Sequence, residues 1–332
     1  MTFVIAEAGV NHNGDLALAE RLVDAAKAAG ADAVKFQTFR ADSLASDSAA
    51  LAPYQAAAGA RGGQQAMLAK LELDEAAHRR LQQRARGTSL EFLSTPFDEE
   101  SADMLERLEI TRFKIPSGEI TNKGLIEHVA RKGRPVILST GMSTLDEVRR
   151  AVDWIRAMSS APLTVMHCVT AYPAPADQVN LRAMGTLREA LGLPIGYSDH
   201  TPGTEVAVAA AALGAAVIEK HLTLDRTMAG PDHAASLEPE EFAQMVRHIR
   251  TVSSALGDGV KRPAPCEETN RAAARRSLVA ARALSAGRAL ARDDLAAKRP
   301  GGGVSPADIE RVLGKTLRRA LRRDETLTED CL

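Results

Sequence analysis

The chain has 332 residues, and its 42 Lys and Arg against 43 Asp and Glu give a formal net charge of −1. That balance argues against a protein whose main partner is nucleic-acid phosphate, because such proteins usually carry a large basic excess. With 45% hydrophobic and 26% charged residues the chain is neither disordered nor fibrous, and its longest apolar run, residues 206–218, is shorter than the roughly 20 residues of a membrane span.

Short apolar runs recur along residues 1–257, and each ends in a cluster of polar residues. The runs have the length and the nearly continuous apolar character of strands that are covered on both faces. We therefore predict a series of buried strands. In chain order they are residues 3–9, 33–38, 90–97, 112–119, 135–142, 163–173, 194–202 and 216–223.

Amphipathic stretches lie between these runs. In the first of them Leu18, Leu22 and Ala25 recur at helical spacing, and Gly30 ends the helix. Residues 40–67 form an oversized loop after the second strand, of the kind that usually carries function. The predicted helices are residues 16–30, 98–108, 123–132, 144–158, 181–191, 203–213 and 238–256.

Alternating strands and helices predict a parallel sheet, and eight strand–helix units in about 257 residues match a (β/α)8 barrel. The competing fold is an open, doubly wound sheet. That fold would normally show a G-x-G-x-x-G turn after its first strand, whereas the turn here reads EAGVNHNG. We therefore predict an α/β fold of the TIM-barrel type.

The composition changes after the predicted barrel. Residues 271–332 hold 14 basic and 8 acidic side chains, whereas residues 1–270 hold 28 and 35. From Ser277 onward, short β-like pieces alternate with tight turns. The predicted organisation is a barrel at 1–257, a linker at 258–276 and a small, mostly β domain at 277–332.

Cys168, Cys266 and Cys331 are too few and too scattered for a disulfide framework or a Cys-based zinc site. The first residues, MTFVIAEAG, lack the basic segment and the unbroken apolar run of a signal peptide. We therefore expect a cytoplasmic protein with neither membrane nor nucleic-acid partners.

Parallel barrels carry their active sites at the carboxyl ends of the strands, and the polar residues of this chain collect there. Lys35 and Lys114 lie on the second and fourth predicted strands. Two ammonium groups among many hydroxyls suit a phosphate or a carboxylate. The alternative is that both are ordinary strand-end lysines in surface ion pairs.

His200 and His221 end the seventh and eighth predicted strands, which are neighbours, so that their rings can meet. Two imidazoles together with water and a substrate oxygen suit a divalent ion such as Mn²⁺, Zn²⁺ or Co²⁺. Glu7 or Asp232 could join or orient them. The alternative is that both histidines make only structural hydrogen bonds.

Lysines on barrel strands also raise the possibility of Schiff-base chemistry, for which Lys114 and Lys220 are the candidates. Lys220 directly precedes His221, and consecutive side chains of a strand point to opposite faces. If His221 faces the barrel mouth, Lys220 faces away from it.

Nine segments taken together resemble the sialic acid synthase (N-acetylneuraminate synthase) family, which includes bacterial legionaminate synthases. The C-terminal KRPGGG and its flanks resemble the antifreeze-like (SAF) domain of that family. The nine segments, in chain order, are AEAGVNHNG, VKFQTF, FLSTPFD, FKIPSGE, ILSTGM, HCVTAYPAP, GYSDHT, EKHLTLD and GPDHAASLEP.

The resemblance implies that phosphoenolpyruvate condenses with an N-acetylated amino sugar, N-acetylmannosamine, to give a nine-carbon 2-keto acid and phosphate. The near alternative is an acceptor of the 2,4-diacetamido-2,4,6-trideoxymannose type, which gives N,N'-diacetyllegionaminate. The resemblance also implies a divalent metal, Mn²⁺ or Mg²⁺, and a domain-swapped homodimer in which the SAF domain of one subunit covers the barrel mouth of the other.

The resemblance further implies roles for individual residues. Glu7 and Glu119 would handle protons and, with His221, form the catalytic set; His200 and His221 would hold the metal. The expected substrate contacts are Lys35, Thr95, Lys114, Ser117, Ser139 and Ser198 for phosphoenolpyruvate, and Gln37, Tyr172, Asp232 and the partner's Arg299 for the sugar.

Two functions of other classes remain open from the sequence. One is a lysine-dependent barrel aldolase, which would form a covalent adduct with pyruvate. The other is a non-catalytic carbohydrate- or ice-binding protein that acts through residues 277–332.

Overall fold

The computed structural model describes residues 2–52, 55–56, 61–88 and 90–332. The chain divides into two compact units, Met1–Gly257 and Asp258–Leu332. Among the described residues, no helix is long and apolar enough to cross a bilayer.

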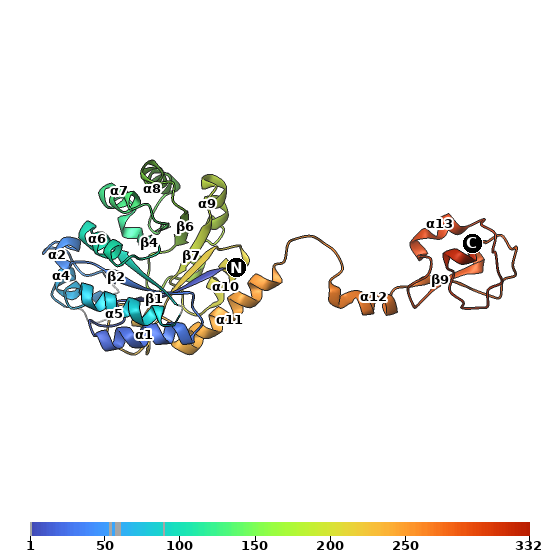
Figure 1. Ribbon diagram of the computed structural model, residues 1–332, viewed down its shortest axis with the longest axis horizontal. Coiled ribbons are helices and arrows are strands. Elements are labelled where there is room, and N and C mark those ends of the chain that lie inside the picture. Colours follow the sequence, from blue (N-terminus) through green and yellow to red (C-terminus); the bar gives the residue numbers. More distant parts are fainter. Residues whose placement is uncertain (1, 53–54, 57–60, 89) are drawn as a thin grey trace. The chain divides into compact units, whose positions relative to one another are not determined.

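The first unit is a ring of eight parallel strands. Hydrogen bonds join the strands in the order β3-β2-β1-β8-β7-β6-β5-β4, and β3 also lies next to β4, so that the two ends of the sheet meet. Figure 1 shows these strands inside a layer of helices. The predicted (β/α)8 barrel is confirmed. The strands are β1 (Phe3–Gly9), β2 (Ala33–Thr38), β3 (Glu91–Pro96), β4 (Phe113–Ile115), β5 (Val136–Ser139), β6 (Leu163–Cys168), β7 (Ile195–Asp199) and β8 (Val217–His221).

Helices connect the strands and cover the outside of the ring. Several of them begin at a residue whose side chain caps the helix: at the first, Asp15 accepts a hydrogen bond from the backbone N–H of Ala17 at 2.7 Å. The helices are α1 (Leu16–Ala28), α2 (Ala41–Leu44), α4 (Gly63–Leu68), α5 (Glu75–Arg86), α6 (Glu99–Arg107), α7 (Lys123–Arg131), α8 (Leu145–Met158), α9 (Ala183–Leu191), α10 (Glu205–Ala212) and α11 (Pro239–Ala255).

The helix α5 is absent from the predicted set. Its sequence, EAAHRRLQQRAR, has Leu81 as its one large apolar residue, and its buried face otherwise consists of small or polar side chains such as Ala77, His78 and Ala85. Because the apolar period is so weak, the pattern does not indicate a helix, although α5 packs against α1 and β3.

The barrel interior changes from apolar to polar along the strands. A plug of apolar side chains fills one end of the ring, and it consists of Ile5, Ala33, Leu93, Ile137, Met166 and Val217. Alternate residues of a strand face the same side, so the residues two positions further along face the interior as well. These residues are Glu7, Lys35, Thr95, Ser139, Cys168 and Glu219. The alternation therefore places a polar layer directly above the plug, at the carboxyl ends of the strands.

The second unit is built around a two-stranded antiparallel sheet of β9 (Ser277–Ala280) and β10 (Leu295–Lys298). Single bridges add later segments to it, as between Val279 and Thr326. A small core of its own includes Leu278, Leu317 and Leu327. The predicted small, mostly β domain is confirmed. Its helices are α12 (Glu268–Ala274) and α13 (Ile309–Val312).

Residues 258–276, predicted as a linker, are partly folded. They contain α12, and the carbonyl of Ala272 in this helix accepts a hydrogen bond from the backbone N–H of Gly301 at 2.9 Å. The later half of the segment is therefore folded as a part of the second unit.

Candidate active site

The barrel has a cavity of about 410 Å³ at the carboxyl ends of its strands. All the predicted site residues except Arg299, which belongs to the second unit, line this cavity. They are Glu7, Lys35, Gln37, Thr95, Lys114, Ser117, Glu119, Ser139, Tyr172, Ser198, His200, His221 and Asp232. The structure thus brings into one place residues that are up to 225 positions apart in the sequence.

Buried ion pairs form the floor of the cavity. The Nζ atom of Lys35 lies 2.6 Å from Oε2 of Glu7 and 3.6 Å from Oε2 of Glu219. Lys114 Nζ donates to both carboxylate oxygens of Glu219, at 2.8 and 3.0 Å, and Lys35 also donates to the hydroxyl of Thr95 at 2.9 Å. All five side chains are buried. The two lysines are therefore not in surface ion pairs, which was the alternative interpretation of the sequence.

The two lysines differ in how firmly they hold their protons. Burial works against the charge of Lys35, but the carboxylates of Glu219 and Glu7 outweigh it and raise the pKa of Lys35. Burial lowers the pKa of Lys114 in spite of its contact with Glu219. Burial alone would raise the pKa of Glu219, but the ammonium groups of Lys114 and Lys35 hold that pKa well below its usual range. Glu219 is therefore the fixed negative charge of the floor.

Glu219 is a residue to which the sequence analysis assigned no role. Besides the two lysines it binds Ser198, whose Oγ donates to Oε1 of Glu219 at 2.9 Å. The alternation along β8 could have indicated it, because Glu219 lies two residues before His221 and so faces the same side.

A group of hydroxyls and one thiol lies beside the floor. Ser117 Oγ accepts a hydrogen bond from the backbone N–H of Gly141 at 2.9 Å and lies 3.1 Å from Sγ of Cys168. A Cβ atom on Gly141 would lie 2.0 Å from Oγ1 of Thr170 and 3.0 Å from Ser117 Oγ. The lack of a side chain at Gly141 therefore lets these polar groups converge.

The two histidines lie side by side, as their strand ends predict. The ring centroids of His200 and His221 are 5.5 Å apart, and the ring of Tyr172 lies 4.3 Å from His200 and 5.7 Å from His221. Burial lowers the pKa of His200, and burial together with His200 and Lys35 lowers the pKa of His221 well below 6.5. Both rings are therefore in the neutral form that binds metal ions.

The nitrogen atoms of these rings fit a divalent metal. His200 Nδ1 donates to the carbonyl of Val169 at 2.7 Å, so its Nε2 carries the lone pair. Among the described side chains, His221 Nδ1 is a buried polar atom without a hydrogen-bond partner, and Oδ2 of Asp232 is 3.7 Å away. The described residues contain no group of three or more His, Cys, Asp and Glu that could hold a metal ion. The protein would therefore supply two imidazoles, and the remaining ligands would be water and substrate.

Glu7 and Asp232 face each other across Gly9. A Cβ atom on Gly9, whose φ is +50°, would lie 3.2 Å from Oε1 of Glu7 and 3.6 Å from Oδ2 of Asp232. Burial and the charge of Glu7 raise the pKa of Asp232 to about 7, and burial raises the pKa of Glu7 although Lys35 beside it pulls it down. Gln37 donates to Oε1 of Glu7 at 3.2 Å. This end of the cavity can therefore hold and move protons.

The remaining candidates are split between the cavity and the outside of the barrel. Glu119 lies in a short turn after β4, where its Oε2 accepts a hydrogen bond from Asn122 at 2.7 Å. Lys220 is outside the cavity and fully buried, with its Nζ 2.6 Å from Oδ2 of Asp199. His221 lines the cavity, so the predicted opposite orientation of Lys220 is confirmed.

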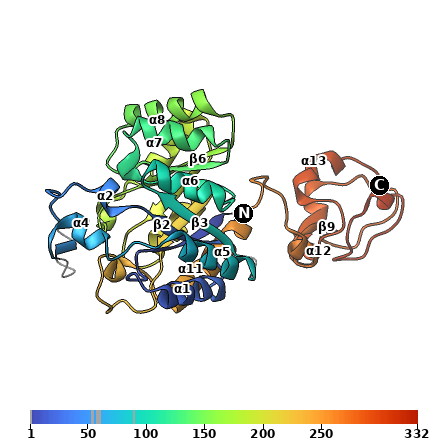
Figure 2. The ribbon, with the colours of Figure 1, turned by 60° about the vertical axis from the view of Figure 1, so that its left-hand side comes forward.

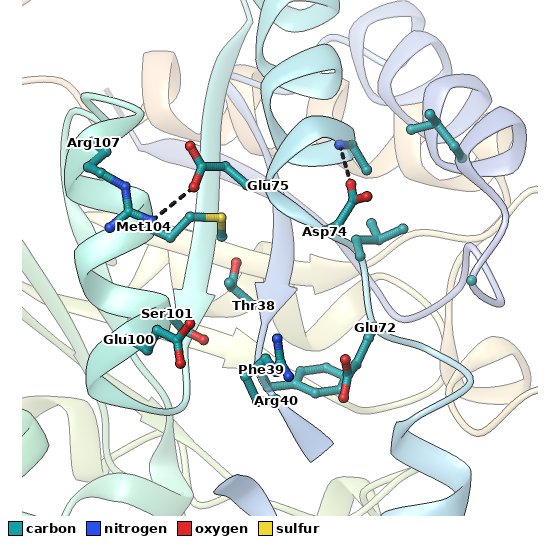
Figure 3. Close-up of a pocket in the computed structure, with 14 residues that line it drawn as sticks. Thr38, Phe39, Arg40, Glu72, Asp74, Glu75, Glu100, Ser101, Met104 and Arg107 are labelled. Atoms are coloured by element: carbon teal, nitrogen blue, oxygen red, sulfur yellow. Dashed lines mark hydrogen bonds and ion pairs between the residues drawn. The ribbon is translucent and has the colours of Figure 1, made fainter. Parts of the chain in front are cut away.

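A second pocket, of about 560 Å³, lies between the start of α5 and α6 (Figure 3). Three of its carboxylates are engaged within the fold: Asp74 accepts from the backbone N–H of Ala77 at 2.7 Å, Glu75 accepts from Arg107 at 2.9 Å, and Glu72 accepts from the backbone N–H of Ala41 at 2.6 Å. The described residues that line it include neither a lysine nor a histidine. The lysines and histidines that the predicted chemistry requires therefore line the cavity at the barrel mouth and not this pocket.

Comparison with known proteins places the chain in a family. Residues 22–261 match the NeuB family and residues 275–332 match the SAF domain. The N,N'-diacetyllegionaminic acid synthase of Campylobacter jejuni is 46% identical over 331 residues, 99% of either chain. The enzyme of the same name from Legionella pneumophila is 47% identical and covers 98% of this chain and 93% of its own.

Among solved structures, the N-acetylneuraminic acid (sialic acid) synthetase of Leptospira borgpetersenii is 35% identical. It matches 81% of this chain and 90% of its own with a TM-score of 0.74. The chain therefore belongs to the NeuB family of sialic acid-type synthases and ends in a SAF domain.

Proposed function

We propose that this enzyme condenses phosphoenolpyruvate with 2,4-diacetamido-2,4,6-trideoxymannose to give N,N'-diacetyllegionaminate and phosphate. The observation that carries the reaction class is the single cavity in which the ammonium groups of Lys35 and Lys114 lie with the imidazoles of His200 and His221. The choice of acceptor is supported by the two relatives named above, which share nearly half of their residues with this chain over almost their full length.

The second candidate acceptor is N-acetylmannosamine, the main expectation from the sequence. This acceptor is supported by the similarity of the chain to the N-acetylneuraminic acid synthetase. That protein has a lower sequence identity to the chain, and matches a smaller part of it, than the legionaminic acid synthases do. Both acceptors present an N-acetyl group and an aldehyde carbon, so the same residues would carry the bond-forming step.

In this proposal the floor of the cavity binds phosphoenolpyruvate. Lys35 and Lys114 supply positive charge for its phosphate and carboxylate groups, and hydroxyl groups supply neutral donors around them. The residues in this role are Lys35, Thr95, Lys114, Ser117, Ser139 and Ser198. Gln37, Tyr172 and Asp232, which line the same cavity, bind the sugar.

The reaction forms one carbon–carbon bond and releases phosphate. Carbon 3 of phosphoenolpyruvate attacks the aldehyde carbon, whose oxygen takes up a proton, and carbon 2 becomes cationic. Water adds to carbon 2 and loses one proton, which leaves a hydroxyl group there. The carbon–oxygen bond to phosphate then breaks, and the proton of that hydroxyl passes to the departing phosphate to leave the 2-keto acid. Glu7, at the floor, and Glu119, at the rim, are the carboxylates to which we assign these proton transfers.

His200 and His221 would hold a divalent metal, Mn²⁺ or Mg²⁺. When bound there, the ion supplies Lewis-acid polarisation of the sugar aldehyde. The chain's own contribution is to keep both rings neutral and buried, with Nδ1 of His200 fixed by its hydrogen bond to the carbonyl of Val169.

We also propose that the protein is a domain-swapped homodimer in which Arg299 of the partner subunit approaches the acetamido group of the sugar. The proposal rests on the resemblance of KRPGGG to the SAF domain and on the match of residues 275–332 to that domain.

A phosphate-release assay tests the proposed function. The purified protein is incubated with phosphoenolpyruvate, Mn²⁺ or Mg²⁺ and either acceptor, and the keto acid is identified by mass. We expect phosphate with both N-acetylated sugars and a higher kcat/KM for the diacetamido-trideoxy sugar. No phosphate with either sugar in fully metallated protein would reject the proposal.

Trapping with borohydride and pyruvate tests the aldolase alternative. Lys114 is held by Glu219 and Lys220 by Asp199, so we expect no covalent adduct. An adduct on either lysine would favour the aldolase. Activity confined to residues 277–332 and independent of His221 would favour the non-catalytic binding protein.

A further inference from the structure

One part of the active-site cavity is apolar. Among its lining residues are six large hydrophobic side chains, which we call the apolar wall: Val10, Leu44, Met67, Leu68, Leu71 and Phe97. All six belong to one hydrophobic cluster that is separate from the main barrel core. The wall and the charged floor are thus parts of the same cavity.

Most of the wall comes from the oversized loop between β2 and α5. Helices α2 and α4 of this loop lie together at one end of the barrel (Figures 1 and 2), and they supply Leu44, Met67 and Leu68. Residues 40–67, which the sequence predicts to carry function, therefore contribute side chains to the cavity. Residues 53–54 and 57–60 of the loop lie outside the described part of the chain.

The wall is held in place by the loop's own contacts. Ala41 N donates to Oε1 of Glu72 at 2.6 Å, and Gln64 N donates to the carbonyl of Ala49 at 3.0 Å. Phe39 and Phe97 pack edge to face, with centroids 6.0 Å apart. These contacts fix the described part of the loop that carries the wall.

The wall distinguishes between the two candidate acceptors by their chemistry. N-acetylmannosamine ends in a hydroxymethyl group, and against Leu and Met side chains its hydroxyl would lose water without gaining a hydrogen-bond partner. The trideoxy sugar ends in a methyl group at the same carbon. A methyl group gains from contact with an apolar wall and leaves no polar group unpaired.

Amide side chains lie next to the wall. Gln55 and Gln64 line the same cavity, and Nε2 of Gln64 is 3.5 Å from Oε1 of Gln55. The trideoxy sugar carries a second acetamido group at carbon 4, beside the carbon that bears its terminal segment. An acetamido group offers one donor and one acceptor, which carboxamide side chains can match.

We propose that the apolar wall binds the methyl end of the acceptor and so selects a 6-deoxy diacetamido sugar over a 6-hydroxy sugar. This inference rests on the proposed function and names the side chains that set its acceptor. Leu44 and Leu68 are the best probes, because they are partly buried and line the cavity.

The test compares kcat/KM for the two acceptors at saturating phosphoenolpyruvate in Leu68→Asn and Leu44→Asn. Asn is close to Leu in shape but polar, so it removes the preference for a methyl group. We expect the ratio of kcat/KM for the trideoxy sugar to that for N-acetylmannosamine to fall about tenfold, as for a methyl-sized contact in a binding pocket. Leu51→Asn is the matched control, because Leu51 packs on the same cluster but does not line the cavity; its ratio should equal that of the unsubstituted protein.

Each outcome bears on one of the two proposals. An unchanged ratio in both variants, or an equal loss with both sugars, would overturn the role of the wall, since the wall would then only pack or would bind the acetamido group that both sugars share. A ratio that falls equally in Leu51→Asn would also overturn it. Failure of the unsubstituted protein to turn over either sugar would instead reject the proposed function itself.

Discussion

Glu219 is the side chain on which both lysines of the active site depend. It accepts hydrogen bonds from Lys114 and Ser198 and lies 3.6 Å from Lys35. Without it, two buried ammonium groups would share the single carboxylate of Glu7. The anionic substrate proposed above would bring negative charge to the same place, so Glu219 and the substrate are alternative counter-ions for these lysines.

We expect Glu219→Gln to lower the free energy of unfolding by about 3–5 kcal/mol, because it leaves buried charges without their partner. Inorganic phosphate should then raise the Tm of the variant more than that of the unsubstituted protein, since it replaces the lost charge. Thermal unfolding with and without phosphate measures both effects.

Glu91→Gln is the control for that experiment. Glu91 is a partly buried carboxylate of the same sheet that pairs with Arg112 at 2.7 Å and does not line the cavity. Its variant should respond to phosphate as the unsubstituted protein does. Equal phosphate shifts in Glu219→Gln and Glu91→Gln would show that Glu219 does not neutralise an anion-binding site.

At the scale of elements, β7 and β8 sort their polar residues onto two faces. His200 and His221 face the cavity. Their immediate neighbours in the sequence, Asp199 and Lys220, point away from the cavity and form an ion pair whose side chains have no exposed surface. Asp199 also accepts hydrogen bonds from Tyr197 Oη at 3.2 Å and Thr201 N at 3.0 Å. The outer pair thus fixes the strand ends that carry the two histidines.

We expect Lys220→Met to destabilise the barrel by about 3–5 kcal/mol, because Asp199 is left buried and unpaired. The double variant Lys220→Met, Asp199→Asn removes both charges and should recover part of that loss. Chemical denaturation of the single and double variants gives the two values. A single variant as stable as the unsubstituted protein would contradict the structural role of the pair.

The elements that could be predicted best from the sequence are those with one dominant pattern, such as a continuous apolar run or a strict alternation of faces. The eight strands were recognisable because both of their faces are covered, and the orientation of Lys220 followed from alternation alone. Helix α5 was missed because Leu81 is the only large apolar residue of its buried face.

The parts of the site that depend on tertiary contacts could not be predicted in the same way. The link between Glu219 and Lys114 joins residues 105 positions apart, and a single sequence does not tell which inward-facing side chains meet. The apolar wall could not be predicted either, because residues 40–67 lack a helical or strand period, although their length marked them as functional.

At the scale of the whole molecule, the second unit has its own buried charge. Asp294 has no exposed surface, and its carboxylate accepts hydrogen bonds from Arg288 at 2.8 Å and from Arg282 at 2.7 Å. The hydrogen bond from Arg288, aided by Arg282, holds the pKa of Asp294 well below 3.8. A carboxylate whose pKa is lower in the folded than in the unfolded protein stabilises the fold. This stabilisation is complete at pH values above the unfolded-state pKa, and it is lost as the pH falls through the folded-state pKa.

We therefore expect acid below about pH 4 to weaken the second unit progressively through Asp294. Asp294→Asn should lower the free energy of unfolding of this unit by about 1–3 kcal/mol near neutral pH, because charged hydrogen bonds are lost from a buried group. The difference between the variant and the unsubstituted protein should shrink as the pH falls. Circular dichroism at several pH values follows it, and a difference that grows on acidification would contradict the assignment.

The domain-swapped arrangement makes a prediction that neither unit makes alone. If the active site combines His221 of one subunit with Arg299 of its partner, then His221→Ala and Arg299→Ala should each be inactive or strongly impaired as homodimers. In a mixed dimer of the two variants, one site would carry both substitutions and the other would carry neither. Random mixing makes half of the dimers mixed, so co-expression should restore about a quarter of the full phosphate-release activity. In a dimer whose sites are each built from one chain, every site would keep a lesion, and co-expression would restore nothing.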